Sequence, residues 1–589
     1  MGRMWLDSPV LWHSSRDRGE MNMALTPAQA ALIQARWLNW YTADWDYGQT
    51  TLAFFCAAIG AAAVLNLASS WRARRSAKRP AGGAPQRAGV LARATAGFRF
   101  FTARQFRVRA TGWYAPPLAA MLAVGAMAIV VLSLMLGPRP YYWASAAMGH
   151  SQPVATRSGW IALGIMPFMI AFATKVNFVT ILTGTSHEKL QVFHRWSAVL
   201  MYITSLVHTF PFIVREIKMG TMNESWSTGT FYWTGVAALV PQTYLMALSW
   251  GIFRNPYYEI FKKLHFIAAG IFMAALFLHC DFTLTSWDYF FATAAIYASV
   301  WLARVLRTLY TTRLGLPATV TRAAPTLLRI RVPVPRAGGR LKWAPGQHVF
   351  VRVAGLGGAH ALTSHPFTIA SVRADAAAEL VVREHRGLTG ALARRVDKEG
   401  AGGEWTTRVV VDGPYGGVHI ALQGYDRVLL LAGGSGATFT LPLLSDLAAH
   451  IKEGARCQHV EFVVAVRDTE SYAWMADTVS AATALAPAHI ATRVHVTGAP
   501  AKLGGGSGKG DDSTSESDAG SGHEAGRPDL AQLVHDAAHA GAARVAIIAC
   551  GPDGFLYDVR NAVAGAQLEI LDGFGPCEEV FLHTESYSW

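Results

Sequence analysis

The sequence predicts a multi-domain membrane protein: an α-helical transmembrane bundle, then an antiparallel β-barrel, then an α/β domain built on a parallel sheet. Three observations lead to this fold class. Seven apolar stretches in the first half of the 589 residues are long enough to cross a bilayer. Short alternating strands begin at about residue 315, and after residue 427 buried apolar strands alternate with helical segments.

The seven predicted spans share high hydropathy and a length near 20 residues, and they run approximately 51–70, 115–137, 160–183, 190–214, 230–252, 259–281 and 287–306. The segment 71–114 carries eleven Lys or Arg and no Asp or Glu, which predicts a cytoplasmic location. Counting spans from there places residues 1–50 outside and the end of the seventh span inside. Asn223 then becomes an outward-facing glycosylation acceptor in Asn223-Glu224-Ser225. We recognise no cleavable signal peptide in the first residues.

The composition argues against nucleic-acid binding and against cysteine-based disulfide or metal sites. Hydrophobic residues make up 52% and charged residues 15%, a bias typical of membrane proteins. The net charge of +13 does not indicate nucleic-acid binding, because much of the basic excess lies beside a predicted span. Five cysteines without a CxxC pair predict neither a disulfide framework nor a thiolate metal site.

Two pairs of histidines stand out in the apolar half. His194 and His208 are 14 residues apart (208 − 194), as are His265 and His279 (279 − 265). On a helix, 14 residues return to within about 40° of the same face and advance about 21 Å. Two such helices facing each other suit two bis-histidine haems, whereas a single buried histidine would more simply be a packed core residue. The topology pairs the first histidine of each helix at the inner level and the second of each at the outer level.

The barrel region, 315–422, contains the stretches PGQHVFVRV, HPFTIAS and VDGPYGG. The second stretch can hold a flat ring and offer a hydroxyl and backbone N–H groups through His365, Pro366, Phe367 and Thr368. The alternative for this stretch is an ordinary strand with a proline bend. Arg383 and the turn that contains Thr389 precede a predicted helix, whose N-terminus favours anions, although the turn could also serve only as a helix cap.

The α/β region, 427–589, opens with a glycine-rich turn after a buried strand, formed by Gly433, Gly434, Gly436 and Thr438. Such a turn at a helix N-terminus suits a pyrophosphate. Phe439 stands where the Rossmann fingerprint has its third glycine, so a Rossmann dehydrogenase is not implied. Arg467, at the end of the next strand, can meet a 2′-phosphate and favour NADPH, or it is a solvated strand end. Residues 499–529 are rich in Gly, Ser and Asp and predict a disordered insertion.

Taken together, the barrel and nucleotide motifs resemble the ferredoxin-NADP reductase superfamily. With the histidine helices, residues 115–589 apart from the insertion resemble the ferric reductase / NADPH oxidase family of transmembrane flavocytochromes, in particular the fungal ferric-chelate reductases. The resemblance implies a haem domain at 115–306, preceded by an extra span and basic loop at 51–114. It implies two haem b groups, FAD and NADPH as cofactors. It also implies two catalytic positions, Cys550 beside the nicotinamide and the terminal Trp589 against the flavin ring.

The expected function is electron transfer from cytosolic NADPH through FAD and two haems to an extracytoplasmic acceptor. Ferric chelates or cupric ions are the expected acceptors, and His150 in an outward loop could assist metal capture or be a solvated loop residue. Superoxide production from O2 is the alternative, and a haem-bearing transporter or sensor is a third reading. The expected location is the plasma membrane, with the vacuolar membrane as the alternative. Family members suggest a permease or oxidase partner in iron uptake.

Overall fold

The computed structural model describes residues 26–77, 88–143, 151–335, 338–400, 402–498, 523–573 and 577–586. The chain divides into two compact units, which are described separately. The first comprises Met1–Leu67 and Leu122–Ala303, and the second comprises Ala68–Met121 and Arg304–Trp589. The predicted fold class is confirmed: transmembrane-length helices are followed by an antiparallel barrel and a parallel sheet.

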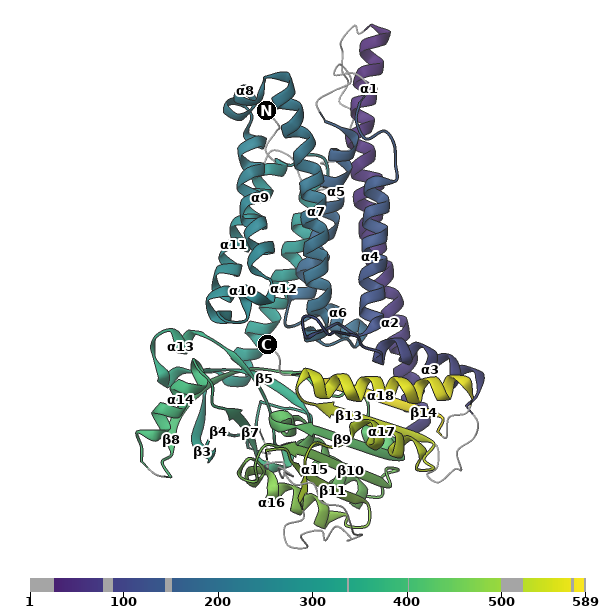
Figure 1. Ribbon diagram of the computed structural model, residues 1–589. Helices are drawn as coiled ribbons and strands as arrows, with labels where there is room; N and C mark the ends of the chain where they lie inside the picture. The colour runs from purple at the N-terminus through teal and green to yellow at the C-terminus, as the bar shows by residue number, and fades with distance from the viewer. Residues whose placement is uncertain are drawn as a thin grey trace, which may run out of the picture. The chain divides into compact units, whose positions relative to one another are not determined.

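The first unit is helical (Figure 1). Its elements, some of which continue into the second unit, are α1 (Pro27–Thr42), a π-helical turn (Ala43–Gly48), α2 (Gln49–Ala77), α4 (Leu118–Leu136), α5 (Pro153–Ala173), α6 (Phe178–Thr183), α7 (His187–Met219), α8 (Met222–Thr228), α9 (Thr230–Leu248), α10 (Gly251–Arg254), α11 (Tyr258–Cys280) and α12 (Ser286–Thr312). Among the described residues, six helical stretches are long and apolar enough to cross a membrane: Ala43–Trp71, Leu118–Leu136, Pro153–Ala173, His187–Met219, Tyr258–Cys280 and Ser286–Thr312. The predicted span 230–252 corresponds to the helix α9. Polar residues such as Thr234 and Gln242 lower its mean hydropathy, so α9 is not among these six stretches.

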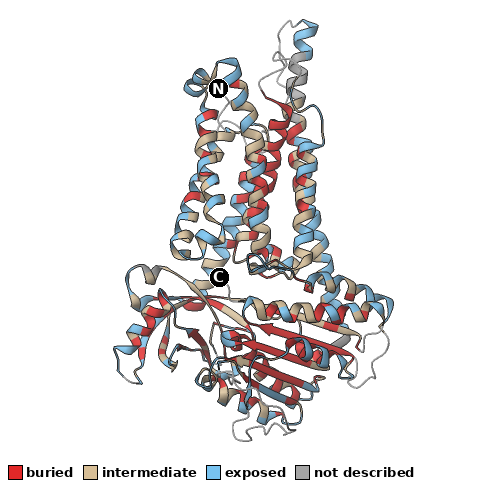
Figure 2. Cartoon of the chain, viewed as in Figure 1, coloured by how far each residue is buried: buried red, intermediate tan, exposed pale blue. Residues whose placement is uncertain are grey.

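Helix α5 forms the centre of this bundle. In the most apolar part of α5, 83% of the residues are buried. In the corresponding parts of the other five candidate spans, 11–22% of the residues are buried. Figure 2 shows this continuous burial along α5. It packs against α7, while α11 packs against α9. The outward faces of the remaining helices stay apolar and exposed, as expected of helices that meet lipid.

The second unit contains a six-stranded antiparallel barrel. Its strands are β3 (Leu316–Ala324), β4 (Leu327–Pro333), β5 (Gln347–Val353), β6 (His365–Thr368), β7 (Ala377–Arg383) and β8 (Trp405–Gly416), in the order β6-β5-β8-β3-β4-β7. The edges meet just after β6, where the Ala370 N–H donates to the Glu379 carbonyl (2.7 Å) and the Ser371 hydroxyl donates to the Ala377 carbonyl (2.8 Å). Alternate apolar side chains fill the interior, and α14 (Leu388–Asp397) buries its apolar face against them. A short helix, α13 (Gly358–Leu362), lies between β5 and β6.

The α/β part of the second unit is a parallel sheet in the order β12-β11-β10-β9-β13-β14. Its strands are β9 (Arg427–Gly433), β10 (His459–Val466), β11 (Ile490–Val496), β12 (His523–Ala525), β13 (Arg544–Cys550) and β14 (Glu579–Glu585). Helices α15 (Ala437–Lys452) and α16 (Glu470–Leu485) share one core with this sheet, and α17 (Leu530–His539) and α18 (Asp553–Asp572) share another. The central strands read as apolar runs because both of their faces are covered.

The sequence prediction is wrong at one end of the proposed insertion 499–529. Residues 523–525 form β12, which pairs in parallel with β11 through Val494 and His523. Asp529 then caps α17 by accepting from the N–H groups of Ala531 and Gln532. An edge strand needs only backbone partners, so the polar composition here did not predict it. Residues 499–522 lie outside the described part of the chain.

A second difference concerns the basic segment 71–114. The sequence predicts only a cytoplasmic loop there, but the described residues include α3 (Val90–Ala103) and a hairpin of β1 (Arg107–Val108) and β2 (Trp113–Tyr114). Helix α3 belongs to the second unit and packs against α18 and β14. Local sequence patterns do not report such a tertiary contact.

Candidate functional site

The four predicted histidines come together as two pairs inside the first unit. The ring centroids of His194 and His265 lie 6.4 Å apart, and those of His208 and His279 lie 5.9 Å apart. An imidazole nitrogen lies about 1.1 Å from its ring centroid and binds a first-row metal at about 2 Å, so two rings that share one metal ion on a common axis have centroids about 6.2 Å apart. Both pairs therefore leave the space that one iron with two axial imidazoles requires.

Three of the four rings are oriented by backbone carbonyls. Nδ1 of His194 donates to the Met169 carbonyl (2.9 Å), Nδ1 of His208 to that of Ala155 (2.8 Å), and Nδ1 of His279 to that of Phe231 (2.9 Å). This fixes the tautomer and leaves Nε2 of each ring for a metal. Nδ1 of His265 is buried without a hydrogen-bond partner among the described residues.

Two helix glycines make room for the rings of His208 and His279, and sequence reasoning missed them. A Cβ added at Gly159 would lie 2.7 Å from Nδ1 of His208, and one at Gly235 would lie 3.0 Å from Cε1 of His279. Each glycine stands four residues after the carbonyl that accepts from the same ring, Ala155 or Phe231. A glycine at this place lets the imidazole reach a helix carbonyl that a side chain would otherwise cover.

Within the described residues, no group of three or more His, Cys, Asp or Glu side chains could hold a metal ion. His150 lies outside the described residues.

The predicted flavin residues converge on the seam of the barrel. The half-buried residues from His365 to Thr368 form the edge strand β6, which pairs with β5. The residues after β6 run antiparallel to β7. The Ala370 N–H donates a hydrogen bond to the Glu379 carbonyl, and the Ser371 hydroxyl donates one to the Ala377 carbonyl. Because the two segments are antiparallel, residues earlier in β6 lie opposite residues later in β7. The exposed Arg383, at the end of β7, therefore lies on the side of β6. The seam thus offers aromatic, hydroxyl and cationic groups together.

Thr389 contacts its own turn. Its hydroxyl, in the first turn of α14, accepts a hydrogen bond from the N–H of His385, which precedes the helix (2.9 Å). Gly387, just before the helix, has φ +81°. This contact stabilises the turn between β7 and α14.

The VDGPYGG stretch ends β8 in a polar cluster around Asp412. The buried carboxylate accepts from Nε of Arg304 (2.6 Å), Nη2 of Arg307 (3.2 Å) and the hydroxyl of Tyr415 (2.7 Å). Burial and the neighbouring carboxylate raise the pKa of Tyr415, so it remains a neutral donor. The two arginines come from the last turns of α12, and they attach these turns to the barrel.

The predicted nucleotide turn lies at the switch point of the parallel sheet. From β9 the chain proceeds to β10 on one side and later returns to β13 on the other, so the carboxyl ends of β9 and β13 flank a crevice. Open α/β sheets bind their ligands at such a point. The two turns approach closely: a Cβ at Gly436 would lie 2.1 Å from the Cys550 carbonyl, and one at Gly433 would lie 2.9 Å from Pro552. Gly434 has φ +58°, which a glycine adopts without strain.

The residue that departs from the Rossmann fingerprint joins the two domains of this unit. Phe439 is 2% exposed and stacks on His583 with centroids 5.7 Å apart. Its ring also meets the barrel turn at Gly346, where an added Cβ would lie 2.9 Å from it. Thr438, beside it, donates from its hydroxyl to the Ser435 carbonyl (2.9 Å) and stabilises the glycine-rich turn.

The remaining predicted residues lie at the same edge of the sheet or outside the described chain. Arg467 is exposed directly after β10, and its carbonyl accepts from Gly498 (2.8 Å). Cys550 ends β13 with its side chain fully buried among apolar residues. Trp589 lies outside the described residues.

Comparison with protein families gives three matches in the expected order. Residues 158–276 match the ferric reductase like transmembrane component, 318–419 match an FAD-binding domain and 425–564 match the ferric reductase NAD binding domain. Together these ranges include more than half of the chain. The predicted flavin-binding and nucleotide-binding domains are thereby confirmed.

Curated relatives agree. The chain is 35% identical over 377 residues to a probable cell surface ferric reductase, kap2, of Aspergillus oryzae, covering 61% of this chain and 49% of that protein. It is 28% identical over 366 residues to the ferric/cupric reductase transmembrane component 7 of Saccharomyces cerevisiae, covering 60% and 56%. The chain thus spans about half the length of these relatives. The predicted resemblance to fungal reductases is confirmed, and the chain belongs to the ferric reductase family.

Proposed function

We propose that this chain transfers electrons from NADPH across a membrane to a ferric or cupric chelate on the opposite side. The proposal rests on the two histidine pairs. In each pair, the distance between the ring centroids suits two imidazoles that bind one iron. They occur in one chain with a flavin-binding and a nucleotide-binding domain. When bound, FAD would supply the conversion of a two-electron hydride into single electrons, and haems held by the histidine pairs would supply one-electron acceptors.

The residues have separate roles in this proposal. His194 and His265 would hold the haem on the NADPH side, and His208 and His279 would hold the one on the acceptor side. The residues of β6, with Arg383 and Thr389, would bind FAD, while the glycine turn and Thr438 would bind the dinucleotide pyrophosphate. Cys550 and Trp589 would border the nicotinamide. With two histidines at each level, a haem held there would have both axial positions taken by protein, which would favour outer-sphere transfer to a chelate.

Arg467 supports the choice of NADPH over NADH, because an exposed guanidinium after β10 can add a charge-assisted contact to a 2′-phosphate. Arg467→Ala should reduce the ratio of kcat/KM for NADPH to that for NADH by roughly tenfold or more, as expected for a contact worth 1.5–3 kcal/mol. Arg493→Ala is the matched control, because this arginine pairs with Glu461 instead. An unaltered ratio in Arg467→Ala would assign the phosphate to another group.

The decisive assay for the acceptor uses the full chain in lipid, supplied with haem, FAD and NADPH. Fe(III)-chelate is offered without oxygen, and O2 is offered without iron. We expect Fe(II) at a rate that accounts for most NADPH oxidation, and slow superoxide formation. Superoxide at the full rate of NADPH oxidation, with no Fe(II) under anaerobic conditions, would contradict a metal reductase.

A further inference from the structure

Helix α3 has two apolar faces, and among the described residues only one of these faces is covered by protein. Ala96 and Ala103 are buried against the α17–α18 side of the sheet, and Gly97 faces Leu571 of α18. At about 100° per residue, these positions lie on the arc that also contains Arg99. This arc attaches α3 to the nucleotide-binding domain.

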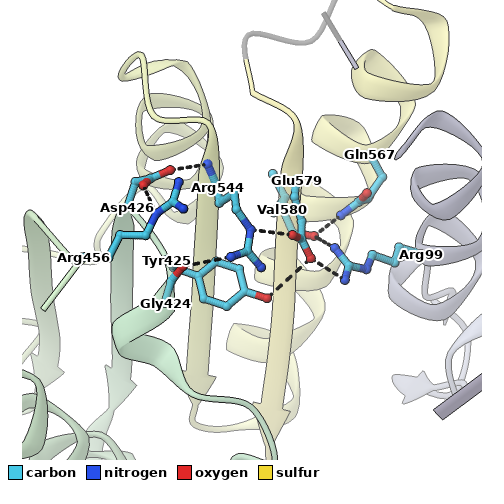
Figure 3. Close-up of polar contacts among 9 residues, drawn as sticks. All are labelled: Arg99, Gly424, Tyr425, Asp426, Arg456, Arg544, Gln567, Glu579 and Val580. Carbon is cyan, nitrogen blue, oxygen red and sulfur yellow. Dashed lines mark hydrogen bonds and ion pairs between the residues drawn. The ribbon is translucent and has the colours of Figure 1, made fainter. Parts of the chain in front are cut away.

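Arg99 fastens this inner arc to β14 (Figure 3). Its guanidinium donates to a carboxylate oxygen of Glu579 (2.7 Å) and to the carbonyl of Val580 (2.9 Å). The other carboxylate oxygen accepts from Nε of Arg544 (2.8 Å). Glu579 is therefore shared between the basic segment 71–114 and β13 of the sheet.

The opposite arc of α3 is apolar and exposed. It consists of Val90, Leu91, Phe98 and Phe101, which are 86%, 65%, 55% and 43% exposed. On a helical projection these four residues fall within about 100° of one another, opposite the buried arc. The hairpin that follows adds three more exposed apolar side chains, Phe106, Val108 and Trp113. Several large apolar side chains exposed on one helix arc and on the hairpin that follows it indicate an interaction site.

The chain itself brings this surface to the membrane. Helix α4, a candidate span, starts at Leu118, and the Leu118 N–H donates to the carbonyl of Arg104, the residue after α3 (2.8 Å). On the other side, the candidate span of α2 ends at Trp71, whose exposed ring lies under the guanidinium of Arg75 (4.6 Å). Aromatic and basic residues at the end of a span are typical of the lipid interface. Both ends of the segment therefore emerge from the bilayer.

The charge of the segment specifies the kind of lipid. Residues 71–114 contain eleven Lys or Arg and no acidic residue. Arg104 and Arg107 lie over the rings of Phe106 and Tyr114, so cations and apolar groups are interleaved along the exposed surface. An amphipathic, basic surface joined to transmembrane helices suits anionic phospholipid headgroups.

We propose that the exposed arc of α3 and the β1–β2 hairpin lie in the headgroup region of the bilayer and bind anionic phospholipid. The opposite arc, through Arg99 and Glu579, holds the nucleotide-binding domain to this membrane-bound helix. The proposal requires only that the chain is a multi-pass membrane protein, and it is independent of the electron acceptor and of haem binding.

The test places a nitroxide label on the full chain in nanodiscs, in a Cys56→Ala background because Cys56 is exposed. Phe101→Cys reports on the proposed surface, and Leu485→Cys on α16 is the matched control, since both side chains are 43% exposed. We expect the label at 101 to be accessible to O2 and protected from a water-soluble nickel complex, at a depth of about 5–10 Å. The label at 485 should be accessible to the nickel complex. Phe98→Cys repeats the measurement if Phe101→Cys does not fold.

Two results would overturn the lipid assignment. Equal nickel accessibility at 101 and 485 would mean that the surface faces water. Protection of the label from both reagents would mean that a protein segment covers it. Adding phosphatidylserine to phosphatidylcholine nanodiscs should increase the depth of the label, and Arg107→Gln with Arg109→Gln should abolish that increase. An equal depth in both lipid compositions would refute the preference for anionic headgroups.

The attachment of the nucleotide-binding domain is tested separately by hydrogen exchange in the same nanodiscs. Arg99→Ala should accelerate exchange in β14 and α18 while the label on α3 stays in the lipid. Arg322→Ala, which removes an exposed arginine bound to Asp397 and Glu384 on the barrel, is the control and should leave β14 unchanged. Unchanged exchange in Arg99→Ala would refute the attachment through Glu579.

Discussion

At the scale of single residues, the pair formed by His208 and His279 depends on glycines as much as on imidazoles. His208 and His279 each donate to a helix carbonyl, and each ring occupies space that a side chain at Gly159 or Gly235 would need. The histidines could be predicted from their 14-residue spacing. The glycines could not, because a glycine within an apolar helix has no distinguishing pattern until the neighbouring ring is known.

We therefore expect Gly159→Ala and Gly235→Ala to displace the outer ligands and lower the haem content to about half of the wild-type value. Gly270→Ala is the control, because a Cβ at Gly270, on the same helix as His279, meets no atom within 4 Å. Haem is measured per protein by the pyridine haemochromogen spectrum. Full haem content with an unchanged reduced spectrum in both variants would contradict the positioning role.

Glu579 makes the second unit sensitive to acid. Burial raises the pKa of this carboxyl, but Arg99 and Arg544 outweigh burial and hold it below its ordinary value of 4.5. A lowered pKa in the folded state stabilises the fold above the ordinary value, and that stability is lost as the pH falls through the folded-state pKa. The Tm difference between wild type and Glu579→Gln should therefore be constant near pH 7 and shrink below about pH 4.5. A difference that is independent of pH would assign the effect to packing.

At the scale of elements, six of the seven predicted spans overlap helices long and apolar enough to cross a membrane, although the helix that overlaps 160–183 is Pro153–Ala173, and the nucleotide-binding turn occurs where it was predicted. The strand β9, its glycine turn and α15 occur where the sequence places them, because local chemistry determines that unit. The attachment of α3 and the edge strand β12 were missed, since both depend on partners far away in the sequence. Phe439 was noted only as a departure from a motif, and its contact with Gly346 explains it.

The Asp412 cluster gives an element-scale prediction. Asp412→Ala leaves Arg304 and Arg307 without their carboxylate and detaches the last turns of α12 from the barrel. Since both arginines are partly exposed, we expect a loss of about 2 kcal/mol, below the range for fully buried pairs. Rapid mixing should show FAD reduction by NADPH near the wild-type rate, and haem reduction slowed. Equal rates and equal Tm in Asp412→Ala and wild type would contradict this role.

At the scale of the whole molecule, two histidine levels about 21 Å apart lie within one bundle, and the flavin-binding and nucleotide-binding domains follow in the same chain. Each part alone has several explanations. The proposed movement of single electrons through the membrane would account for their combination, because that proposal requires both a hydride acceptor and two metal sites at different depths.

The most direct test of this claim is made in proteoliposomes with Fe(III)-chelate sealed inside and NADPH added outside under anaerobic conditions. The account predicts that Fe(II) forms inside the vesicles, and that His208→Ala abolishes it while NADPH still reduces FAD. Fe(II) that forms only when the chelate shares the NADPH side, or that forms inside at the wild-type rate in His208→Ala, would contradict transfer through the two histidine pairs.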